Sequence, residues 1–482
     1  MKTIKPTILI GLILMLISSC DVVDNSDPKA FTVPIPQALM SSAQRRYADF
    51  LVNMDPNSNN FRLYAQQWTN LAYQDEANYN QEKRKLGNNI EQILYKDVLI
   101  DLKNSKTFIE KIPALTPEET SIKKNKIAII EIQMINVFQT LVDIFGDVPY
   151  SEALDYTNHP KPKFDDAKTI YLDLAQRLDI AINDLDDTVG SFGTADLVYQ
   201  GNVGNWKKLA NCIKLKMGLH LADVDNAKAK SMVESAYSSG LISDNSENAL
   251  FKYYSTSNEQ SPIYPAVALQ TQWTPTSYFV EELKSKSDPR MDQYFSNKID
   301  NAYIGAPYAI GGSYNKLSHI GKKLAVQSFP GVIFDYSETC FLLADAANRG
   351  YNVGDTSENL YNKGITASMQ YWGVTQADID TYLTRTDVAF ATATGSNNKE
   401  RIAYQLYIAY YNRGFEAWTE NRRLDYPVLV APANAVPESK GKVPVRNIYS
   451  NLQKTLNSTN YEAASAAIGG DFMTTKLFWD KN

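Results

Sequence analysis

Residues 127–154 read IAIIEIQMINVFQTLVDIFGDVPYSEAL, and this stretch decides the fold. Its apolar side chains recur every three or four residues, at Ile127, Ile130, Met134, Phe138, Leu141 and Phe145. That spacing places them on one face of a helix. Gly146 and Pro149 then stop the run, because glycine favours a helix C-terminus and proline cannot continue a helix. The stretch therefore predicts one long helix with a defined end.

The same spacing predicts a succession of helices further along the chain. It recurs in residues 170–185 and 209–221, and a shorter helix is expected to end near Gly240. A last strong helix is predicted over 398–420. We therefore expect an all-α, mainly helical protein.

Two of the predicted helices form a hairpin. Ser337 is expected to cap a helix that runs through Asn348, and Ser357 a helix that runs to Trp372 and ends at Gly373. Together they span about 35 residues, the size of a tetratricopeptide-type (TPR) unit, although the consensus side chains of a true repeat are not obvious. The expected architecture is a TPR-like helical-hairpin scaffold.

Residues 251–334 differ from the rest. They are rich in Tyr, Pro, Gly, Ser and Asn and show no sustained helical period. Long irregular segments in a compact domain are uncommon and often form binding loops. We expect long irregular binding loops here.

The first residues predict the compartment. Lys2 and Lys5 precede an apolar run from Ile8 to Ile17, which is the pattern of a secretory signal and is too short to cross a bilayer. Ser18 and Ser19 then lead to a cysteine, Cys20, in the manner of a bacterial lipobox. We expect a lipoprotein signal peptide over 1–19, an acylated Cys20 with a flexible tether over 20–30, and a single domain over 31–482.

Composition excludes some classes of protein. The chain has 482 residues, 44% of them hydrophobic, which suits a large globular core. Its 48 basic and 54 acidic residues form no basic stripe, so nucleic-acid binding is not expected. No later stretch is expected to span a membrane. Cys212 and Cys340 lie in apolar helical patterns and are expected to be small core residues.

Catalytic motifs are absent from the sequence. The three histidines, His159, His220 and His319, share no metal-ligand spacing, and no H-E-x-x-H, G-x-S-x-G or P-loop motif is present. We predict no enzyme activity, no cofactor and no metal. A glycosidase pair of carboxylates remains an alternative, because such acids meet in space and not along the chain.

Several segments together resemble one known family. Residues 143–154 resemble the D-x-[YF]-G-D-[VI]-P-Y-x-E-A-L signature of the SusD/RagB-like nutrient-binding lipoproteins, in particular the second SusD-like family. Further similar segments follow in the family's order over nearly the whole mature chain, namely 61–79, 199–219, 288–290, 338–349, 361–373, 418–427 and 475–479. Cys212 and Lys216 depart from the usual residues of the second segment. The chain is thus identified as a member of this family.

The resemblance implies a function. A protein of this kind is a helical, TPR-scaffolded lipoprotein of the outer membrane that faces the cell exterior. It sits over a SusC-like TonB-dependent transporter and delivers oligosaccharides or other nutrients to it. Capture of peptides, as in RagB-type proteins, is the alternative on the same scaffold. Gly146, Pro149, Arg422 and Arg423 are read as scaffold residues, the two arginines as anchors for buried carboxylates or carbonyls.

Sugar binding requires a flat apolar ring beside amide or carboxylate groups. The irregular segment offers such groups, and a second cluster lies near residue 75. Trp273 is the leading candidate, with a buried loop anchor as the competing interpretation. The full set of candidate ligand-binding residues is Trp273, Tyr278, Tyr303, Tyr308, Tyr314, Tyr73, Asn78, Tyr79 and Asn80.

Overall fold

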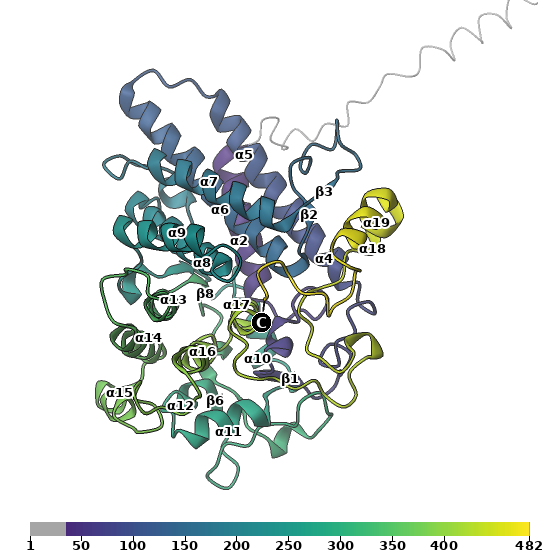
Figure 1. The fold of residues 1–482 in the computed structure, drawn as a ribbon, viewed down its shortest axis with the longest axis vertical. Helices are drawn as coiled ribbons and strands as arrows, with labels where there is room; N and C mark the ends of the chain where they lie inside the picture. The colour runs from purple at the N-terminus through teal and green to yellow at the C-terminus, as the bar shows by residue number, and fades with distance from the viewer. Residues whose placement is uncertain (1–34, 482) are drawn as a thin grey trace, which may run out of the picture. The chain divides into compact units, whose positions relative to one another are not determined.

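Helices dominate the computed structural model, which describes residues 35–481 (Figure 1). The all-α prediction is confirmed. Residues from Pro36 onward form one compact unit. The predicted signal peptide, the acylated Cys20 and the tether of residues 20–30 lie outside the described residues and stay predictions.

The elements of the described part follow one another along the chain. The helices are α2 (Pro36–Val52), α3 (Phe61–Tyr64), α4 (Leu86–Glu91), α5 (Ile100–Lys111), α6 (Pro117–Phe145), α7 (Ala167–Asp184), α8 (Val203–Leu221), α9 (Asn226–Ser239), α10 (Ile263–Ala268), α11 (Ser277–Ser285), α12 (Met291–Tyr294), α13 (Tyr336–Asn348), α14 (Ser357–Trp372), α15 (Gln376–Leu383), α16 (Asn398–Ala409), α17 (Gly414–Leu424), α18 (Asn451–Leu456) and α19 (Ser458–Ala467). The short strands are β1 (Trp68–Asn70), β2 (Val148–Pro149), β3 (Phe164–Asp165), β4 (Ala249–Phe251), β5 (Trp273–Pro275), β6 (Phe295–Ser296), β7 (His319–Ile320) and β8 (Gly331–Phe334). They pair as antiparallel two-stranded sheets, β1 with β5, β2 with β3, β4 with β8 and β6 with β7.

Helix α6 confirms the long helix that opens the sequence analysis. It begins ten residues before Ile127, where Thr116 and Glu119 form a capping box, and it ends before Gly146, whose φ is +86°. By length and composition α6 could cross a membrane, with a mean hydropathy of 1.5 over its most apolar window. However, 78% of that window is buried inside the protein, so α6 is the central core helix.

Helical hairpins build the scaffold, as predicted. Helix α8 packs on α9 and α13 packs on α14, while α6 lies between α5 and α7. The two serines predicted to cap α13 and α14 have another role, because Asp335 and Thr356 are the caps that accept from backbone N–H groups. Ser337 instead donates to the Gly364 carbonyl, and Ser357 to the Ala344 carbonyl. Both serines therefore tie the hairpin together.

The helix predicted over 398–420 is wrong as a single element, because the structure has two helices, α16 and α17. The chain turns between them at Asn412, which has a φ of +68°. A Cβ on Gly414 would lie 2.4 Å from the Arg62 backbone nitrogen, so α17 approaches α3 closely. The break lets α17 pack against α3, a contact that local periodicity does not encode.

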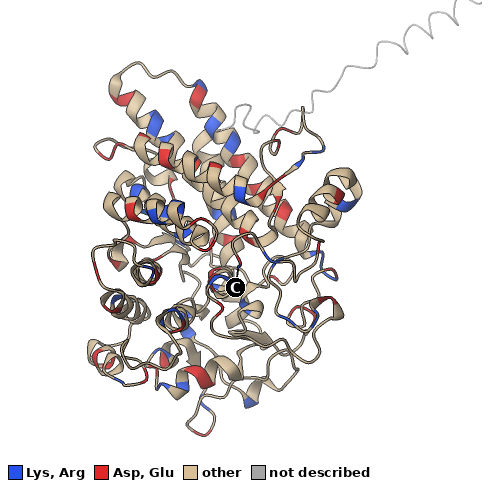
Figure 2. Ribbon diagram, in the orientation of Figure 1, with Lys and Arg blue, Asp and Glu red and all other residues tan. Residues whose placement is uncertain are grey.

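Buried ion pairs hold these helices in register. Arg413 contacts Asp335 (3.0 Å) and Glu338 (2.6 Å) of the α13 segment. Arg423 contacts Asp345 of the same helix at 2.5 Å. Arg422 donates to the Asp143 and Val445 carbonyl oxygens, each at 2.8 Å, and the predicted anchoring role of Arg422 and Arg423 is confirmed. Elsewhere acidic and basic residues are scattered over the ribbon (Figure 2).

Removing Arg413 tests this network. Arg413→Met should lower the free energy of unfolding by about 3–5 kcal/mol, because Asp335 would stay buried without its ion-pair partner and Glu338 would keep only Lys216. Urea unfolding followed by circular dichroism measures the loss. Arg385→Met is the matched control, since Arg385 pairs with Asp387 at the surface, and it should cost far less. Equal small losses in both variants would contradict the importance of the buried network.

His220 should make the stability depend on pH. Its Nε2 lies 3.0 Å from Glu420 and its Nδ1 3.7 Å from Asp143. Burial alone would lower the pKa of His220, but these carboxylates outweigh burial and hold its pKa above the ordinary value. The stabilisation by protonated His220 is therefore complete below the unfolded pKa of about 6.5 and is lost as the pH rises through the folded pKa.

His220→Gln should remove this part of the pH dependence. In urea unfolding at a series of pH values from about 5.5 to 9, the advantage of the parent over His220→Gln should shrink as the pH rises. His159→Gln, which alters a loop histidine near the surface, is the control. Its free energy of unfolding should fall with rising pH as that of the parent does. A parent whose advantage grows with pH would show that His220 is neutral in the folded protein.

Candidate functional site

The irregular segment is joined to the start of the chain by a small sheet. Strand β5 pairs antiparallel with β1, so that Asn70 lies opposite Trp273. The Leu71 N–H continues the pairing and donates to the Gln272 carbonyl oxygen (2.8 Å). The residues that follow β1 and those that precede β5 therefore leave the sheet at the same edge.

A third segment, residues 303–319, lies along this sheet. The Ala306 N–H donates to the Pro275 carbonyl (2.9 Å), and the Ala309 N–H donates to the Thr69 hydroxyl (3.1 Å). Gly305 makes this possible, since a Cβ there would lie 2.3 Å from the Thr276 carbonyl oxygen. Only glycine allows backbones to approach so closely.

A fourth segment comes from the C-terminal part of the chain. The Asn434 side-chain amide donates to the Ala309 carbonyl (3.0 Å), and Gln66 donates to the Val430 carbonyl (2.7 Å). These bonds tie 428–436 to the other loops. We call the surface formed by residues 71–85, 269–272, 303–319 and 428–436 the loop face.

Large apolar side chains on the loop face are open to solvent. Exposed apolar side chains that gather in one patch often mark an interaction surface, whereas single ones are common. They are Tyr73 (55% exposed), Leu269 (68%), Ile304 (41%), Ile310 (56%), Val428 (70%) and Val430 (74%).

Tyr73 is the exposed aromatic side chain among the predicted site residues. The Arg84 guanidinium lies 5.8 Å from the centre of its ring, and Arg84 also pairs with Glu76. Lys83 and Asp75 form a second ion pair nearby in the sequence (2.5 Å). A flat ring beside charged donors and acceptors is what a hydroxyl-rich ligand requires.

Packing buries or half-buries several other predicted residues. Trp273 is 4% exposed in β5, so its ring offers no face to a ligand here, and the competing interpretation of a loop anchor describes its position. Tyr79 is fully buried and accepts from Gln66, while Tyr308 donates to the Leu63 carbonyl (2.7 Å). Tyr278 and Asn78 are half-buried.

Three further predicted residues, Tyr303, Tyr314 and Asn80, are likewise half-buried. Tyr303 donates to Asp292 (2.7 Å), and Tyr314 stacks on His319 with 3.7 Å between ring centres. Asn80 accepts from the Lys83 N–H and lines a recess of about 180 Å³ at the edge of the loop face, with Val436 and Phe472. The structure thus gathers Tyr73 and Asn80 on one loop, while Tyr303 and Tyr314 lie on another.

Sequence reasoning missed the contribution of residues 428–436. Nothing local marks Val428 or Val430 as exposed, because apolar residues more often lie in the core. The signal available was the run of prolines and alanines in 431–437, which is typical of a surface loop.

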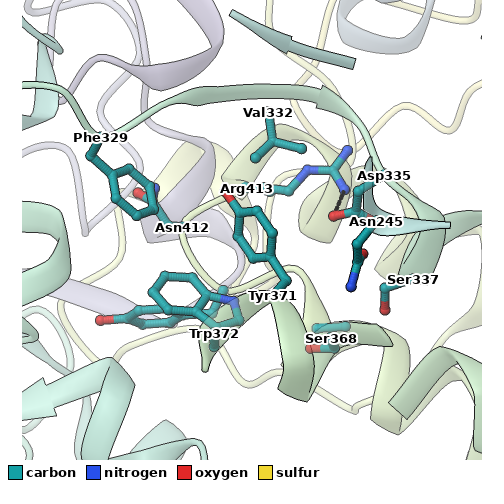
Figure 3. Close-up of a pocket in the computed structure, with 12 residues that line it drawn as sticks. Asn245, Phe329, Val332, Asp335, Ser337, Ser368, Tyr371, Trp372, Asn412 and Arg413 are labelled. Atoms are coloured by element: carbon teal, nitrogen blue, oxygen red, sulfur yellow. Dashed lines mark hydrogen bonds and ion pairs between the residues drawn. The ribbon is translucent and has the colours of Figure 1, made fainter. Parts of the chain in front are cut away.

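A separate cavity lies between β8, α14 and the start of α17 (Figure 3). Trp372 and Phe329 stand on one side and the Arg413–Asp335 pair on the other. Its volume is about 20 Å³, enough for a single water molecule and too small for a nutrient. The buried Tyr371 hydroxyl and Arg413 Nε have no hydrogen-bond partner within residues 35–481, so a water in the cavity could satisfy them.

Metal-binding clusters are absent from residues 35–481: no group of three or more His, Cys, Asp or Glu side chains is placed to hold an ion. Two carboxylates of the loop face, those of Asp75 and Glu76, lie close to Tyr73 in the sequence. Both form ion pairs. The arrangement offers binding groups on an open surface.

The helical-hairpin scaffold is the fold of SusD-like helical proteins. Residues 28–450 match the family SusD-like_2, described as "Starch-binding associating with outer membrane". The chain belongs to this family, whose members are binding proteins. No curated protein matches the chain.

Solved structures agree with this assignment. A chitin-binding protein is 25% identical with a TM-score of 0.77, and the match covers 93% of this chain and 100% of that one. A SusD homologue from Bacteroides uniformis is 24% identical with a TM-score of 0.78, over 92% and 99% of the two chains. A chitin-binding SusD homologue from Flavobacterium johnsoniae is 21% identical with a TM-score of 0.76, over 92% and 99%.

Proposed function

We propose that this protein captures oligosaccharides on its loop face at the outer membrane, without cleaving them. The exposed Tyr73 ring, with Arg84 and Asn80 on the same loop, carries the proposal, because it combines a stacking surface with polar groups at its edge. The open surface suits a long or branched chain better than an enclosed pocket would. The chitin-binding relatives support a saccharide ligand.

Removing the Tyr73 ring tests this proposal. Tyr73→Ala should weaken binding of chito- or malto-oligosaccharides at least about tenfold, equivalent to ~1.4 kcal/mol, because stacking on the ring is lost. Isothermal titration of the purified chain without its signal measures the change. Tyr254→Ala is the control, since Tyr254 is similarly exposed (46%) outside the loop face.

Several outcomes would contradict oligosaccharide capture. If Tyr73→Ala and Tyr254→Ala bind as the parent does, the loop face is not the site. If the parent binds peptides from a defined library and none of the saccharides, the alternative of peptide capture replaces the proposal. Shortened saccharide products after long incubation would show a hydrolase.

The chain is further proposed to act as a lipoprotein that hands its ligand to a SusC-like transporter. Cys20 would carry the lipid, and the family's association with the outer membrane supports this. In cells, Cys20→Ala should move the protein from the membrane fraction to the soluble fraction, with Cys340→Ala as the control. The parent, extracted in detergent, should co-purify with a TonB-dependent transporter. A Cys20→Ala protein that stays in the membrane fraction would contradict the lipid anchor. A parent that purifies without a transporter would contradict the proposed partner.

A further inference from the structure

A larger hollow lies on the helical part of the protein, apart from the recess and the cavity described above. It opens between α5, α6, α7 and the loop that follows β2, and it has a volume of about 560 Å³, within the range of ligand sites. In Figure 1 these helices lie in the upper part of the ribbon, whereas β1 and α11, next to the loop face, lie in the lower part. The hollow is thus separate from the loop face.

The hollow has an apolar floor and a charged rim. Met134, Phe138 and Ile170 form the floor. Asp173 and Arg177 stand on the rim, four residues apart on α7, and therefore about 5–6 Å apart on one face of that helix. This pairs one carboxylate with one guanidinium above an apolar surface.

Neighbouring side chains hold the rim in place. Arg177 donates through Nε to Glu131 (2.6 Å) and through Nη1 to the Tyr150 hydroxyl (2.5 Å), and that hydroxyl donates to Asp173. Burial alone would lower the pKa of Arg177, but Glu131 and Tyr150 together outweigh burial and hold the pKa above its ordinary value. The rim is therefore preorganised.

The rim also keeps unused hydrogen-bonding capacity. Arg177 uses Nε and Nη1, and Asp173 uses Oδ2, in the hydrogen bonds just described. Among the described residues, the remaining atoms of the two groups, Arg177 Nη2 and Asp173 Oδ1, have no hydrogen-bond partner. One free donor and one free acceptor thus lie four residues apart on α7, on residues that line the hollow. The hydroxyl groups of a sugar can donate to such an acceptor and accept from such a donor.

A smaller hollow of about 310 Å³ continues the first one. The two share Ala153, and the smaller is lined by Tyr95, Pro149, Tyr156 and Leu452. Tyr156 is 53% exposed, so its ring is available for stacking. We call the two adjoining hollows the helical groove.

The helical groove combines the groups that a sugar chain requires. Tyr156 supplies a flat ring, Phe138 and Ile170 an apolar floor, and Asp173 with Arg177 a donor and an acceptor. Because the rim carries both signs of charge, it favours a neutral, hydroxyl-rich ligand over a simple cation or anion.

We propose that the helical groove is a second saccharide-binding site, which holds a neutral stretch of the same glycan that the loop face captures. This inference rests on the proposed function. Two weak sites on one chain raise the avidity for a long glycan far above that for a short one, without any new contact at either site. The groove would thus make the protein selective for polymers over short fragments.

Binding stoichiometry tests the helical groove. The chain from residue 21 onward contains the whole compact unit and is titrated with chitotetraose, and with maltotetraose in parallel. The parent should bind two molecules per chain. Tyr156→Ala combined with Asp173→Asn should leave one site, because the stacking ring and the charged acceptor are lost. Tyr73→Ala should also leave one site, and Tyr254→Ala should leave two.

The variants are chosen to preserve folding. Tyr156 is exposed, and Asn at position 173 still accepts from the Tyr150 hydroxyl, so melting temperatures should stay near that of the parent. Tyr156→Trp, which keeps a flat ring, should retain both sites. If the Tyr156→Ala, Asp173→Asn variant binds as the parent does, the groove proposal is overturned while the proposed function stands. If the parent binds neither saccharide, both are overturned.

Discussion

The need to pair buried positive charge governs how this chain is assembled. Arg413, Arg422 and Arg423 lie in or next to α17 and are almost fully buried, where an unpaired guanidinium would be very costly. Their partners lie on α13 and at the end of α6, about 75 to 280 residues earlier in the chain. The C-terminal part can reach its native state only by packing against α6 and α13.

The loop face depends on this assembly. Helix α17 leads directly into residues 428–436, and its close contact with α3 at Gly414 places it beside the segment that enters β1. Strand β1 in turn fixes β5, and with it residues 303–319 through Gly305. Loops from distant parts of the sequence thereby meet on a rigid support, as sites built on irregular segments require.

Sequence periodicity predicted the scaffold well, but not which candidate site residues are exposed. Helices α6, α7 and α8 show their buried faces in the spacing of their apolar residues, so these helices could be predicted locally. The break at Asn412 could not, because it depends on the approach of Gly414 to Arg62. The burial of Trp273 also depends on a distant segment, because β5 pairs with β1, and the sequence around Trp273 does not show this pairing. Tyr73 has no partner strand and stays exposed.

The central claim is that the loop face holds a saccharide. Hydrogen–deuterium exchange in the presence and absence of chitotetraose or maltotetraose tests it most directly, because it reports which backbone segments a ligand shields. The account predicts slower exchange in residues 71–85 and 303–319, and unchanged exchange in α13 and α14. Saccharide binding that leaves both loop segments unchanged would contradict the account.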